Sequence, residues 1–502
     1  MDELKLRLYQ EKILNTCKDK NTLVVLPTGT GKTYLALALA QLKINSGKIF
    51  FLAPTKPLVT QHKELFMNYF NEDSLTVITG AIPPKKRQEY YKTKKIIFET
   101  PQTLENDIIT RRTSLEDTSL IVFDEAHRAI GDYAYCFIAK QYFKQTEKPH
   151  IIALSASPGS DIEKIKEVMD NLYLEKIEAI SSDDPLIKDE IKEKNTIPVF
   201  VDFPLELMET KTILQNIASE NLEALFDLSF SNTKDLSKIR KASLLALQNK
   251  IMSRIHKGSG SILFNALVHV TIIIKIMHCI ELLESHGPKS LISYYEKLIE
   301  QGKTTKSARR LTEDMRFKKA LALAESANER GVEHPKYNIL KKIITAEFNK
   351  SSNSKIIVFT QYREVTRIIE SKIKDIDICR PVVFVGQKEG VTQKKQLEIM
   401  DNFKSGKYNV LICTSVAEEG IHVKDCDVGV FFEPIPSALR TIQRKGRVGR
   451  TLVGKIYVLI TKNSVDEKYY WVSKAKEKRM QYAIKNIKEK EQKNLKTFQM
   501  NF

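Results

Sequence analysis

The sequence lacks several features that mark whole classes of protein. Its six cysteines are scattered and form no Cys-x-x-Cys pair, which argues against a disulfide framework or a zinc ribbon and favours a reducing compartment. The N-terminus is charged and has no apolar core, so no signal peptide is expected. The most apolar run, Ile262 to Ile274, is interrupted by Asn265 and His269 and is too short to cross a bilayer. We expect it to form a buried helix, and we expect no membrane association.

Positive and negative charges are present in unequal amounts. The 502 residues include 80 lysines and arginines against 62 aspartates and glutamates, which gives a formal net charge of +18. Such an excess favours a polyanionic partner and does not by itself choose between nucleic acid and an anionic membrane. A hydrophobic share of 42% and a charged share of 28% exclude a collagen-like or wholly disordered chain. The length suggests about three domains.

Two regions alternate short runs of Ile, Val and Phe with helical patterns. Because these runs are continuous, they are typical of strands buried on both faces of a parallel sheet. The expected strands of the first region are Thr22–Leu26, Ile49–Ala53, Ile96–Phe98, Leu120–Phe123 and Ile151–Leu154. Those of the second region are Lys355–Phe359, Pro381–Val385, Asn409–Cys413, Asp427–Phe432 and Lys455–Ile460. Strand–helix alternation of this kind predicts two α/β domains.

The region between them has almost no strand signal and shows long helical periodicity, so we predict an all-helical insert. Glycine and proline near residues 331–335 mark its end. The tail from Lys462 is helical in pattern and basic, with eleven lysines or arginines against five acids. The predicted domains are residues 1–204 and 336–462 for the two α/β domains, 205–335 for the insert and 463–502 for a basic helical extension.

A phosphate-binding loop is predicted where the first strand ends. The segment reads PTGTGKT over residues 27–33 and precedes an Ala/Leu-rich helix, so backbone N–H groups and the helix dipole can bind phosphate. Lys32 is expected to reach the β- and γ-phosphates, and Thr33 to ligate Mg²⁺. Leu26 stands where the strict pattern has glycine. The residues expected to bind the nucleotide here are Thr28, Gly29, Thr30, Gly31, Lys32 and Thr33.

Two adjacent carboxylates, Asp124 and Glu125, follow another predicted buried strand. Asp124 is suited to hold Mg²⁺, directly or through water, and Glu125 to accept a proton from the attacking water. Acidic residues also occur at ordinary helix N-termini, but here they accompany Lys32 and Thr33. Together the two motifs specify a P-loop nucleoside triphosphatase that uses Mg²⁺.

A third motif reads QRKGRVGR over residues 443–450, in the second α/β region. Arginines spaced by three can point guanidinium groups across a cleft, so Arg447 and Arg450 are expected to neutralise charge on the transferred γ-phosphoryl group. Gln443 is expected to orient water or to sense the phosphate. The alternative is a basic helix that only touches a nucleic-acid backbone.

The order of these motifs resembles that of superfamily 2 helicases of the DEAH-box type, and most of all the archaeal Hef helicases and the Fanconi anaemia M helicases. The innate-immune RNA-sensing helicases are more distant relatives that share the helical insert. The resemblance implies an α/β fold with two RecA-like parallel-sheet domains and an all-helical inserted domain. The segments that carry it are LYQ (8–10), PTGTGKT (27–33), APTKPLVTQH (53–62), TPQT (100–103), DEAHRAIGDYAY (124–135), LSASP (154–158), VFTQY (358–362), FVGQ (384–387), TSVAEEGI (414–421), FEPIPSALRTIQRKGRVGR (432–450) and DEKYYW (466–471).

The resemblance also implies further contacts to the nucleotide. Gln10, with Arg7 nearby, is expected to read the adenine edge, because amide side chains make paired hydrogen bonds to adenine. Glu419 and Gly420 are expected to line the cleft where the two lobes meet the nucleotide. His422 stands where relatives carry an aspartate that contacts the ribose.

Contacts to nucleic acid are implied in the same way. Ser155 and Ser157 are expected to couple the ATP site to the nucleic-acid channel. The insert is either a thumb-like clamp on duplex or branched DNA or a spacer that braces the lobes. The residues expected to contact the phosphodiester backbone are Thr55, Lys56, Thr100, Gln361, Thr414 and Ser415. The clamp candidates are Lys238, Arg240, Lys241, Arg254, Lys257, Arg309, Arg310, Arg316, Lys318 and Lys319.

The implied function is an ATP-dependent DNA helicase or translocase that acts on forked or branched DNA in replication-fork repair. The alternatives are a double-stranded RNA-dependent ATPase of the innate-immune sensor type and a non-enzymatic nucleic-acid scaffold. We expect a monomer that does not cut nucleic acid, because the nuclease signature found in Hef relatives is absent from the sequence. Whether it has nuclease or replication-factor partners stays open. We expect an intracellular protein, cytoplasmic if its source is prokaryotic.

Overall fold

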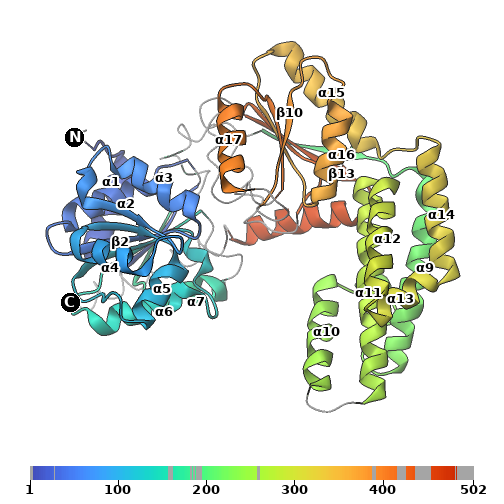
Figure 1. Cartoon of the computed structure of the whole chain (residues 1–502), viewed down its shortest axis with the longest axis horizontal. Helices are drawn as coiled ribbons and strands as arrows, with labels where there is room; N and C mark the ends of the chain where they lie inside the picture. The colour runs from blue at the N-terminus through green and yellow to red at the C-terminus, as the bar shows by residue number, and fades with distance from the viewer. Residues whose placement is uncertain are drawn as a thin grey trace, which may run out of the picture.

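The structure is a computed structural model, which describes residues 4–27, 29–156, 162–180, 184, 187, 195–256, 260–386, 392–414, 426–435, 454–480 and 482. Figure 1 shows two α/β lobes and an elongated bundle of helices that extends from the second lobe. The predicted fold class, two parallel-sheet domains with an all-helical inserted domain, is confirmed.

The first lobe is built on a seven-stranded sheet whose neighbouring strands are all parallel. The strand order is β3-β4-β2-β5-β6-β1-β7. The strands are β1 (Thr22–Val25), β2 (Lys48–Leu52), β3 (Leu75–Ile78), β4 (Ile96–Glu99), β5 (Thr118–Phe123), β6 (Ile151–Ser155) and β7 (Lys176–Ala179). The helices are α1 (Leu8–Asp19), α2 (Lys32–Lys43), α3 (Lys56–Phe66), α4 (Pro84–Thr93), α5 (Pro101–Ile109), α6 (Ala134–Gln145) and α7 (Ile162–Asn171), with short 3₁₀ turns at Glu72–Ser74 and Ala126–Arg128.

Helices cover both faces of this sheet. On one face α1, α2 and α3 pack against the side chains of the central strands, and on the other face α5, α6 and α7 do so. Successive side chains of a strand point to opposite faces, which is why β2 needs Phe50 for one core and Phe51 for the other. Both rings are fully buried. Because both faces of these strands are buried, their sequences are continuous apolar runs.

The second lobe has a six-stranded sheet, again parallel throughout, in the order β10-β11-β9-β12-β13-β8. Its strands are β8 (Asn195–Val201), β9 (Ile356–Phe359), β10 (Pro381–Phe384), β11 (Val410–Cys413), β12 (Val428–Phe431) and β13 (Lys455–Thr461). Its helices are α15 (Pro335–Lys350), α16 (Arg363–Ile373), α17 (Gln393–Lys404) and a helix over residues 465–480 that lies in the predicted C-terminal extension.

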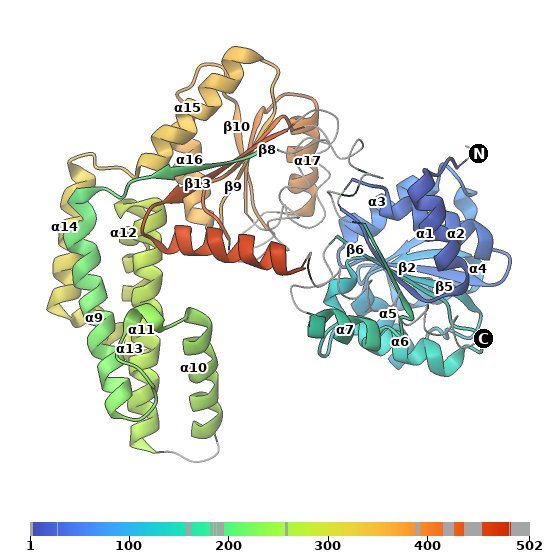
Figure 2. The same cartoon turned by 180° about the vertical axis from the view of Figure 1, so that it is seen from behind.

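Strand β8 corrects one part of the predicted domain division. Residues 195–201 were expected in the first lobe, but they pair in parallel with β13 in the second sheet, from Asn195 beside Lys455 to Val201 beside Thr461. Figure 2 shows this strand running beside β13 before the chain enters the bundle. Pro198 is tolerated because β8 is an edge strand, where a missing N–H costs no ladder bond on the open side. The helical bundle is therefore inserted within the second lobe, between β8 and α15.

The bundle comprises α9 (Met208–Asp227), α10 (Lys241–Ile255), α11 (Ser261–His286), α12 (Pro288–Gly302), α13 (Lys306–Glu313) and α14 (Met315–Glu329), with 3₁₀ turns at Leu205–Leu207 and Leu236–Lys238. The central helix α11 contains the apolar run and has 26 residues. It is longer than the sequence suggested and is long enough to cross a membrane. However, 61% of its most apolar window is buried inside the protein. Ile262 and Phe264, near the start of the run, are 59% and 49% exposed. The predicted buried helix is thus confirmed for the run from Ala266 onward, and α11 forms the core of the bundle.

A buried polar cluster joins the bundle to the second lobe. The ammonium of Lys336, at the start of α15, pairs with Oδ2 of Asp466, and the Ser285 hydroxyl of α11 donates to Oδ1 of Asp466 at 2.6 Å. The side chains of Lys336 and Asp466 are 0% and 2% exposed. Beside them, Glu284 of α11 accepts a hydrogen bond from the backbone N–H of Val465 at 2.8 Å. The end of α11, the start of α15 and the helix at residues 465–480 therefore meet at one carboxylate.

This cluster predicts a large effect of one substitution. Lys336→Met should lower the free energy of unfolding by about 3–5 kcal/mol, because it leaves the Asp466 carboxylate buried without its partner. Lys303→Met is the control, since Lys303 pairs with Glu300 in an exposed ion pair and its loss should cost less than about 1 kcal/mol. Urea denaturation followed by circular dichroism measures both. Equal effects of the two substitutions would contradict the stabilising role of the cluster.

Candidate functional site

The predicted site residues of the first lobe lie at one edge of its sheet. Because all its strands are parallel, their carboxyl ends meet at the same edge, where ligands of such sheets bind. The phosphate loop follows β1, and Asp124 and Glu125 follow β5. Only β6 lies between these two strands, so their ends are about 10 Å apart. Helices α3 and α5 begin at the same edge, after β2 and β4.

The phosphate loop ends at the first turn of α2. Gly29 and Gly31 have φ angles of 91° and 80°, in the left-handed region that favours glycine. Gly31 is the N-cap of α2, and no side chain caps the helix there. A helix N-terminus without a side-chain cap suits phosphate, and phosphate binding at this loop stays a prediction. Thr33 is the second residue of the helix and is half-buried.

Lys32 lies over the loop to which it belongs. Its ammonium group donates a hydrogen bond to the carbonyl of Leu26 at 2.8 Å and lies 3.4 Å from that of Pro27. Leu26 itself is fully buried in the core, and its φ is not positive. The departure from glycine at this position is thus accommodated, since the backbone there needs no left-handed conformation and the side chain has a place to pack.

The backbone of Asp124 is fixed by its neighbours. Its N–H donates to the carbonyl of Leu52 at 2.9 Å, and its carbonyl accepts a hydrogen bond from the Tyr135 hydroxyl at 2.7 Å. Its side chain is held by His62 of α3, whose Nε2 lies 2.9 Å from Oδ2 of Asp124. The sequence analysis quoted His62 only as the last residue of a motif and gave it no role.

The Asp124 carboxyl is held in its ionised form. Burial by itself raises its pKa, but the hydrogen bond from His62 and the positive charge of Lys32 outweigh burial and lower the pKa below its usual value. An ionised carboxylate beside a phosphate loop fits a magnesium ion that shares its ligands with phosphates and water. Among the described residues no group of three or more His, Cys, Asp or Glu could hold a metal ion. That part of the chain therefore contains no metal site built from protein ligands alone.

Glu125 adopts an unusual backbone conformation. Its φ is 52° and its ψ is 48°, a left-handed conformation that costs energy in a residue with a side chain. Within the described part of the chain, its buried Oε2 has no hydrogen-bond partner, and it lies 3.3 Å from Nδ1 of His127. A strained residue with an available acceptor oxygen suits the predicted general base.

Gln10 packs against the phosphate loop. Its Nε2 donates to the carbonyls of Thr30 and Gly31 at 3.2 and 3.4 Å, and its Oε1 accepts from the backbone N–H of Arg7 at 2.9 Å. A Cβ added to Gly31 would lie 2.5 Å from Gln10 Nε2. The neighbouring Tyr9 also donates from its hydroxyl to Thr30 O at 2.6 Å, a contact the sequence did not predict. Recognition of adenine by Arg7 and Gln10 stays a prediction.

The expected nucleic-acid contacts of the first lobe begin two helices. Thr55 is the N-cap of α3 and Lys56 is its exposed first residue, while Thr100 is the N-cap of α5. The Thr55 hydroxyl is buried without a hydrogen-bond partner among the described residues, and that of Thr100 lies 2.8 Å from the hydroxyl of Thr103. The two helices follow adjacent strands, so their N-termini lie side by side at the site edge.

The structure describes only part of the expected site in the second lobe. Gln361 follows β9 and donates its backbone N–H to the Glu433 carboxylate. Thr414 follows β11 and is only 4% exposed. Ser155, in the first lobe, is fully buried. The other expected residues lie outside the described residues and keep their roles as predictions; they are Thr28, Ser157, Ser415, Glu419, Gly420, His422, Gln443, Arg447 and Arg450.

Several candidate cations of the bundle are paired within it. Lys241 Nζ lies 3.0 Å from Glu281, and Arg316 pairs with both Asp314 and Glu220. Arg254 is exposed and forms no ion pair with any residue that the structure describes. Lys257 lies outside the described residues. Among these clamp candidates, Arg254 therefore pairs with no carboxylate that the structure describes, whereas Lys241 shares its charge with Glu281.

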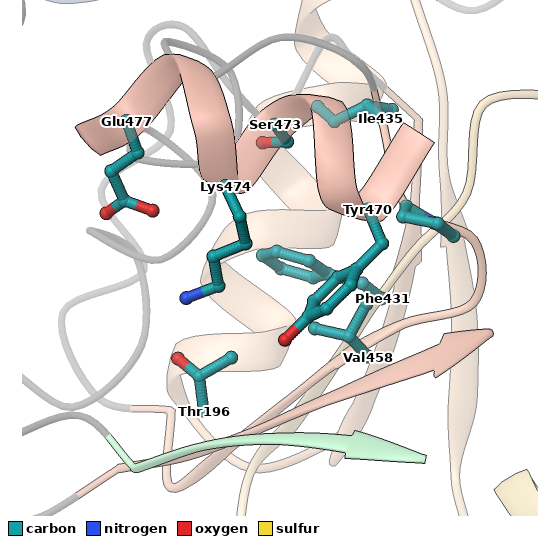
Figure 3. Close-up of a pocket in the computed structure, with 9 residues that line it drawn as sticks. Thr196, Phe431, Ile435, Val458, Tyr470, Ser473, Lys474 and Glu477 are labelled. Carbon is teal, nitrogen blue, oxygen red and sulfur yellow. The ribbon is translucent and has the colours of Figure 1, made fainter. Parts of the chain in front are cut away.

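A small recess lies between the second sheet and the helix at residues 465–480. Figure 3 shows Tyr470 of the helix over Phe431 and Val458 of the sheet, with Lys474 directed toward Thr196 of β8. Of the aromatic residues near the start of this helix, Tyr470 packs on the second lobe, whereas Trp471 is 55% exposed. Tyr469 is also partly buried, and burial raises the pKa of its hydroxyl. The full lining is Thr196, Phe431, Pro434, Ile435, Val458, Tyr470, Ser473, Lys474 and Glu477.

Three family models match successive parts of the chain. The model described as "Type III restriction enzyme, res subunit" matches residues 3–160, which lie in the first lobe. The model "Putative ATP-dependent RNA helicase, helical bundle" matches residues 206–331. The model "Helicase conserved C-terminal domain" matches residues 335–451, in the second lobe. Helicase domains of this kind imply ATP binding.

Full-length relatives are longer than this chain. A protein of Methanocaldococcus jannaschii named "Putative ATP-dependent RNA helicase" is 37% identical over 492 residues, which are 96% of this chain and 61% of that protein. The ATP-dependent DNA helicase mph1 of Neurospora crassa is 30% identical over 92% of this chain and 42% of its own length. The Fanconi anemia group M protein homolog of Mus musculus is 30% identical over 95% of this chain and 26% of its own length.

A solved structure matches over almost its whole length. The helicase domain of Hef from Pyrococcus furiosus is 42% identical, with a TM-score of 0.70, and the match covers 93% of this chain and 97% of that domain. The lobes and the inserted bundle thus recur in one known domain architecture. The chain belongs to the superfamily 2 helicases, in the group that contains the Hef helicase domain.

Proposed function

We propose that the chain is an ATP-dependent DNA helicase or translocase that acts on forked or branched DNA in replication-fork repair. The observation that carries this proposal is the site edge of the first lobe, where an uncapped helix N-terminus, Lys32 and the carboxylates of Asp124 and Glu125 come together. Relatives named as DNA helicases support the choice of substrate. The chain spans 61%, 42% and 26% of the length of these three relatives. An activity of the whole relatives is therefore only proposed for this chain.

The first lobe is proposed to supply the residues that bind the phosphates of ATP and activate the attacking water. Lys32 leaves the loop carbonyls and binds the β- and γ-phosphates, while the N–H groups of α2 bind the phosphate oxygens. Thr33 and Asp124 would hold Mg²⁺, which neutralises phosphate charge when bound. Glu125 accepts the proton of the attacking water through its carboxylate. The second lobe is proposed to complete the site with Gln443, Arg447, Arg450 and Gly420, and Arg7 and Gln10 to contact the adenine.

A single nucleic-acid strand is proposed to lie across both lobes. The contacts go mostly to phosphates, which makes binding largely independent of sequence and sensitive to salt. Closure of the lobes on ATP and their opening after hydrolysis would step the protein along the strand, from 3′ to 5′. The contact residues proposed are Thr55, Lys56 and Thr100 in the first lobe and Gln361, Thr414 and Ser415 in the second.

The relatives include proteins named as RNA helicases and proteins named as DNA helicases. We favour DNA because the mph1 proteins of several fungi carry the name DNA helicase at 30–31% identity over more than 90% of this chain. The relatives compared here give no support to an innate-immune RNA sensor. The bundle is proposed as the clamp on the duplex part of a fork, with Arg254 and Lys241 as contacts, and the protein is proposed to act as a monomer inside the cell.

The role of the phosphate-loop lysine is directly testable. Lys32→Ala should abolish ATP hydrolysis and leave the fold intact, because the hydrogen bonds of the lysine to the carbonyls of Leu26 and Pro27 stay within its own loop. Lys43→Ala, in the last turn of the same helix, is the matched control and should hydrolyse ATP at the parental rate. A phosphate-release assay and circular dichroism measure both properties. Hydrolysis at the parental rate by Lys32→Ala would show that the site is assigned wrongly.

The choice of nucleic acid is tested with a panel of matched substrates. ATPase stimulation and strand displacement are measured on single-stranded, duplex, forked and four-way DNA and on the RNA equivalents. Forked DNA should stimulate most, and RNA forks should stimulate least. Stronger stimulation by RNA forks than by DNA forks would refute the DNA assignment, and no stimulation by any polynucleotide would favour the non-enzymatic scaffold.

The proposed clamp predicts a salt-dependent loss. Arg254→Ala should weaken binding to forked DNA and reduce the slope of log affinity against log salt concentration by about one, because one phosphate contact is lost. Lys234→Ala is the matched control, since Lys234 is a bundle lysine outside the clamp candidates and is paired with Glu223 and Asp227. Fluorescence anisotropy over a series of salt concentrations gives the slopes. An unchanged slope for Arg254→Ala would leave the bundle as a spacer.

A further inference from the structure

A hydrogen bond links the two kinds of site at the edge of the first sheet. It runs from Nε2 of His62, on α3, to Oδ2 of Asp124, after β5, over 2.9 Å. The two side chains are 6% and 12% exposed, so water competes little for this bond. An ionised carboxylate can only accept, which makes His62 the donor. Strands β2 and β5 are neighbours in the sheet, and α3 follows β2, which explains how the two residues meet.

Both ends of this bond are held by other contacts. The Asp124 backbone is pinned on both sides, by Leu52 O at 2.9 Å and by the Tyr135 hydroxyl at 2.7 Å. The His62 ring lies 4.3 Å from the ring of Phe51, which is fully buried. With the main chain of Asp124 fixed, the direction of its carboxylate depends on its side-chain torsions. The hydrogen bond from His62 restricts those torsions.

The helix that carries His62 also begins at the proposed nucleic-acid contacts. Thr55 is its N-cap and Lys56 its first residue. His62 follows the N-cap by two helical turns, or about 10 Å along the axis. The Thr55 hydroxyl is buried and has no hydrogen-bond partner within the described residues. Helix α3 therefore has the Thr55 hydroxyl at its N-terminus, without a hydrogen-bond partner among the described residues, and the His62 ring that holds Asp124 two turns further along.

We propose that His62 is a positioning residue, which orients the Asp124 carboxylate for magnesium-bound nucleotide and couples it to nucleic-acid binding at the start of α3. Hydrogen-bond partners of metal-ligating side chains fix ligand orientation, and their loss weakens metal affinity. A phosphate that binds Thr55 and Lys56 shifts or stiffens α3, and this change reaches Asp124 through the His62 ring. The inference rests on the proposed function, since it assumes that this site binds magnesium and nucleotide.

The test compares three variants of the full chain. His62→Ala removes the donor, His62→Gln keeps an N–H group, and His150→Gln is the matched control. His150 is also a buried histidine of the first lobe, 8% exposed, and its Nε2 lies 2.7 Å from the carbonyl of Cys17, away from the site edge. Thermal denaturation establishes that each variant is folded.

The first measurement is the affinity for a non-hydrolysable ATP analogue, by calorimetry, with and without Mg²⁺. In His62→Ala the gain in affinity on adding Mg²⁺ should fall about 10- to 100-fold, while the affinity without Mg²⁺ stays parental. His62→Gln should restore most of the gain, and His150→Gln should keep all of it. The second measurement is the stimulation of ATP hydrolysis by a single-stranded DNA oligonucleotide, which should fall toward none in His62→Ala alone.

Two results would overturn the inference while leaving the proposed function intact. One is a parental gain from Mg²⁺ and parental stimulation in His62→Ala. The other is an equal loss in His62→Ala and His62→Gln, which would show that the volume of the ring and not its N–H group supports Asp124. If the parental protein itself showed no Mg²⁺-dependent nucleotide binding, the proposed function would fail, and the inference with it.

Discussion

The chemistry of the first lobe depends on the parallel arrangement of its strands, which brings their carboxyl ends to one edge. Residues far apart in the sequence, such as Lys32, Thr55 and Asp124, become neighbours only for this reason. In the proposed function the same edge binds two kinds of ligand, because the phosphate loop and the acidic residues follow β1 and β5, while β2 and β4 lead into helices with polar N-termini. Contacts such as that between His62 and Asp124 are then short enough to link them.

The second lobe uses its sheet in a different way. Its edge strand β8 precedes the bundle in the sequence, and the other five strands of the sheet follow α15. The bundle is thereby tied to the lobe at both of its ends, and Asp466 closes the junction with bonds to Ser285 and Lys336. Any movement of the second lobe relative to the first must carry the start of α15 and the end of α11 with it.

Sequence patterns located strands where both faces are buried. All ten predicted strands are present, because side chains such as Phe50 and Phe51 must enter two cores at once. The three strands that were missed, β3, β7 and β8, all lie at sheet edges. Edge strands bury less of their surface, so their apolar runs are short or interrupted by polar residues, as in the sequence KIEA of β7. The pairing of β8 with β13 involves residues some 260 positions apart and leaves no local signal.

In the candidate site, too, sequence patterns predicted the residues with a local signal and missed the contacts that depend on tertiary packing. Motif spacing identified Lys32, Asp124 and Glu125, because the chemistry requires those residue types next to a strand end. It did not reveal that His62 holds Asp124 or that Tyr9 bonds to the phosphate loop, since both contacts depend on packing between separate elements. The sequence also did not predict the left-handed backbone conformation of Glu125, because the position is occupied by neither glycine nor asparagine.

The central claim is that the two lobes bind one ATP molecule between them, with the first lobe supplying the phosphate loop and the second lobe its arginines. The most direct measurement is a crystal structure of the protein with a non-hydrolysable ATP analogue, Mg²⁺ and a single-stranded DNA oligonucleotide. The account predicts phosphates on the N–H groups at the start of α2, and the Arg447 and Arg450 guanidinium groups about 3 Å from the γ-phosphate oxygens. A nucleotide bound elsewhere, or guanidinium groups that point away from it in the closed complex, would contradict the account.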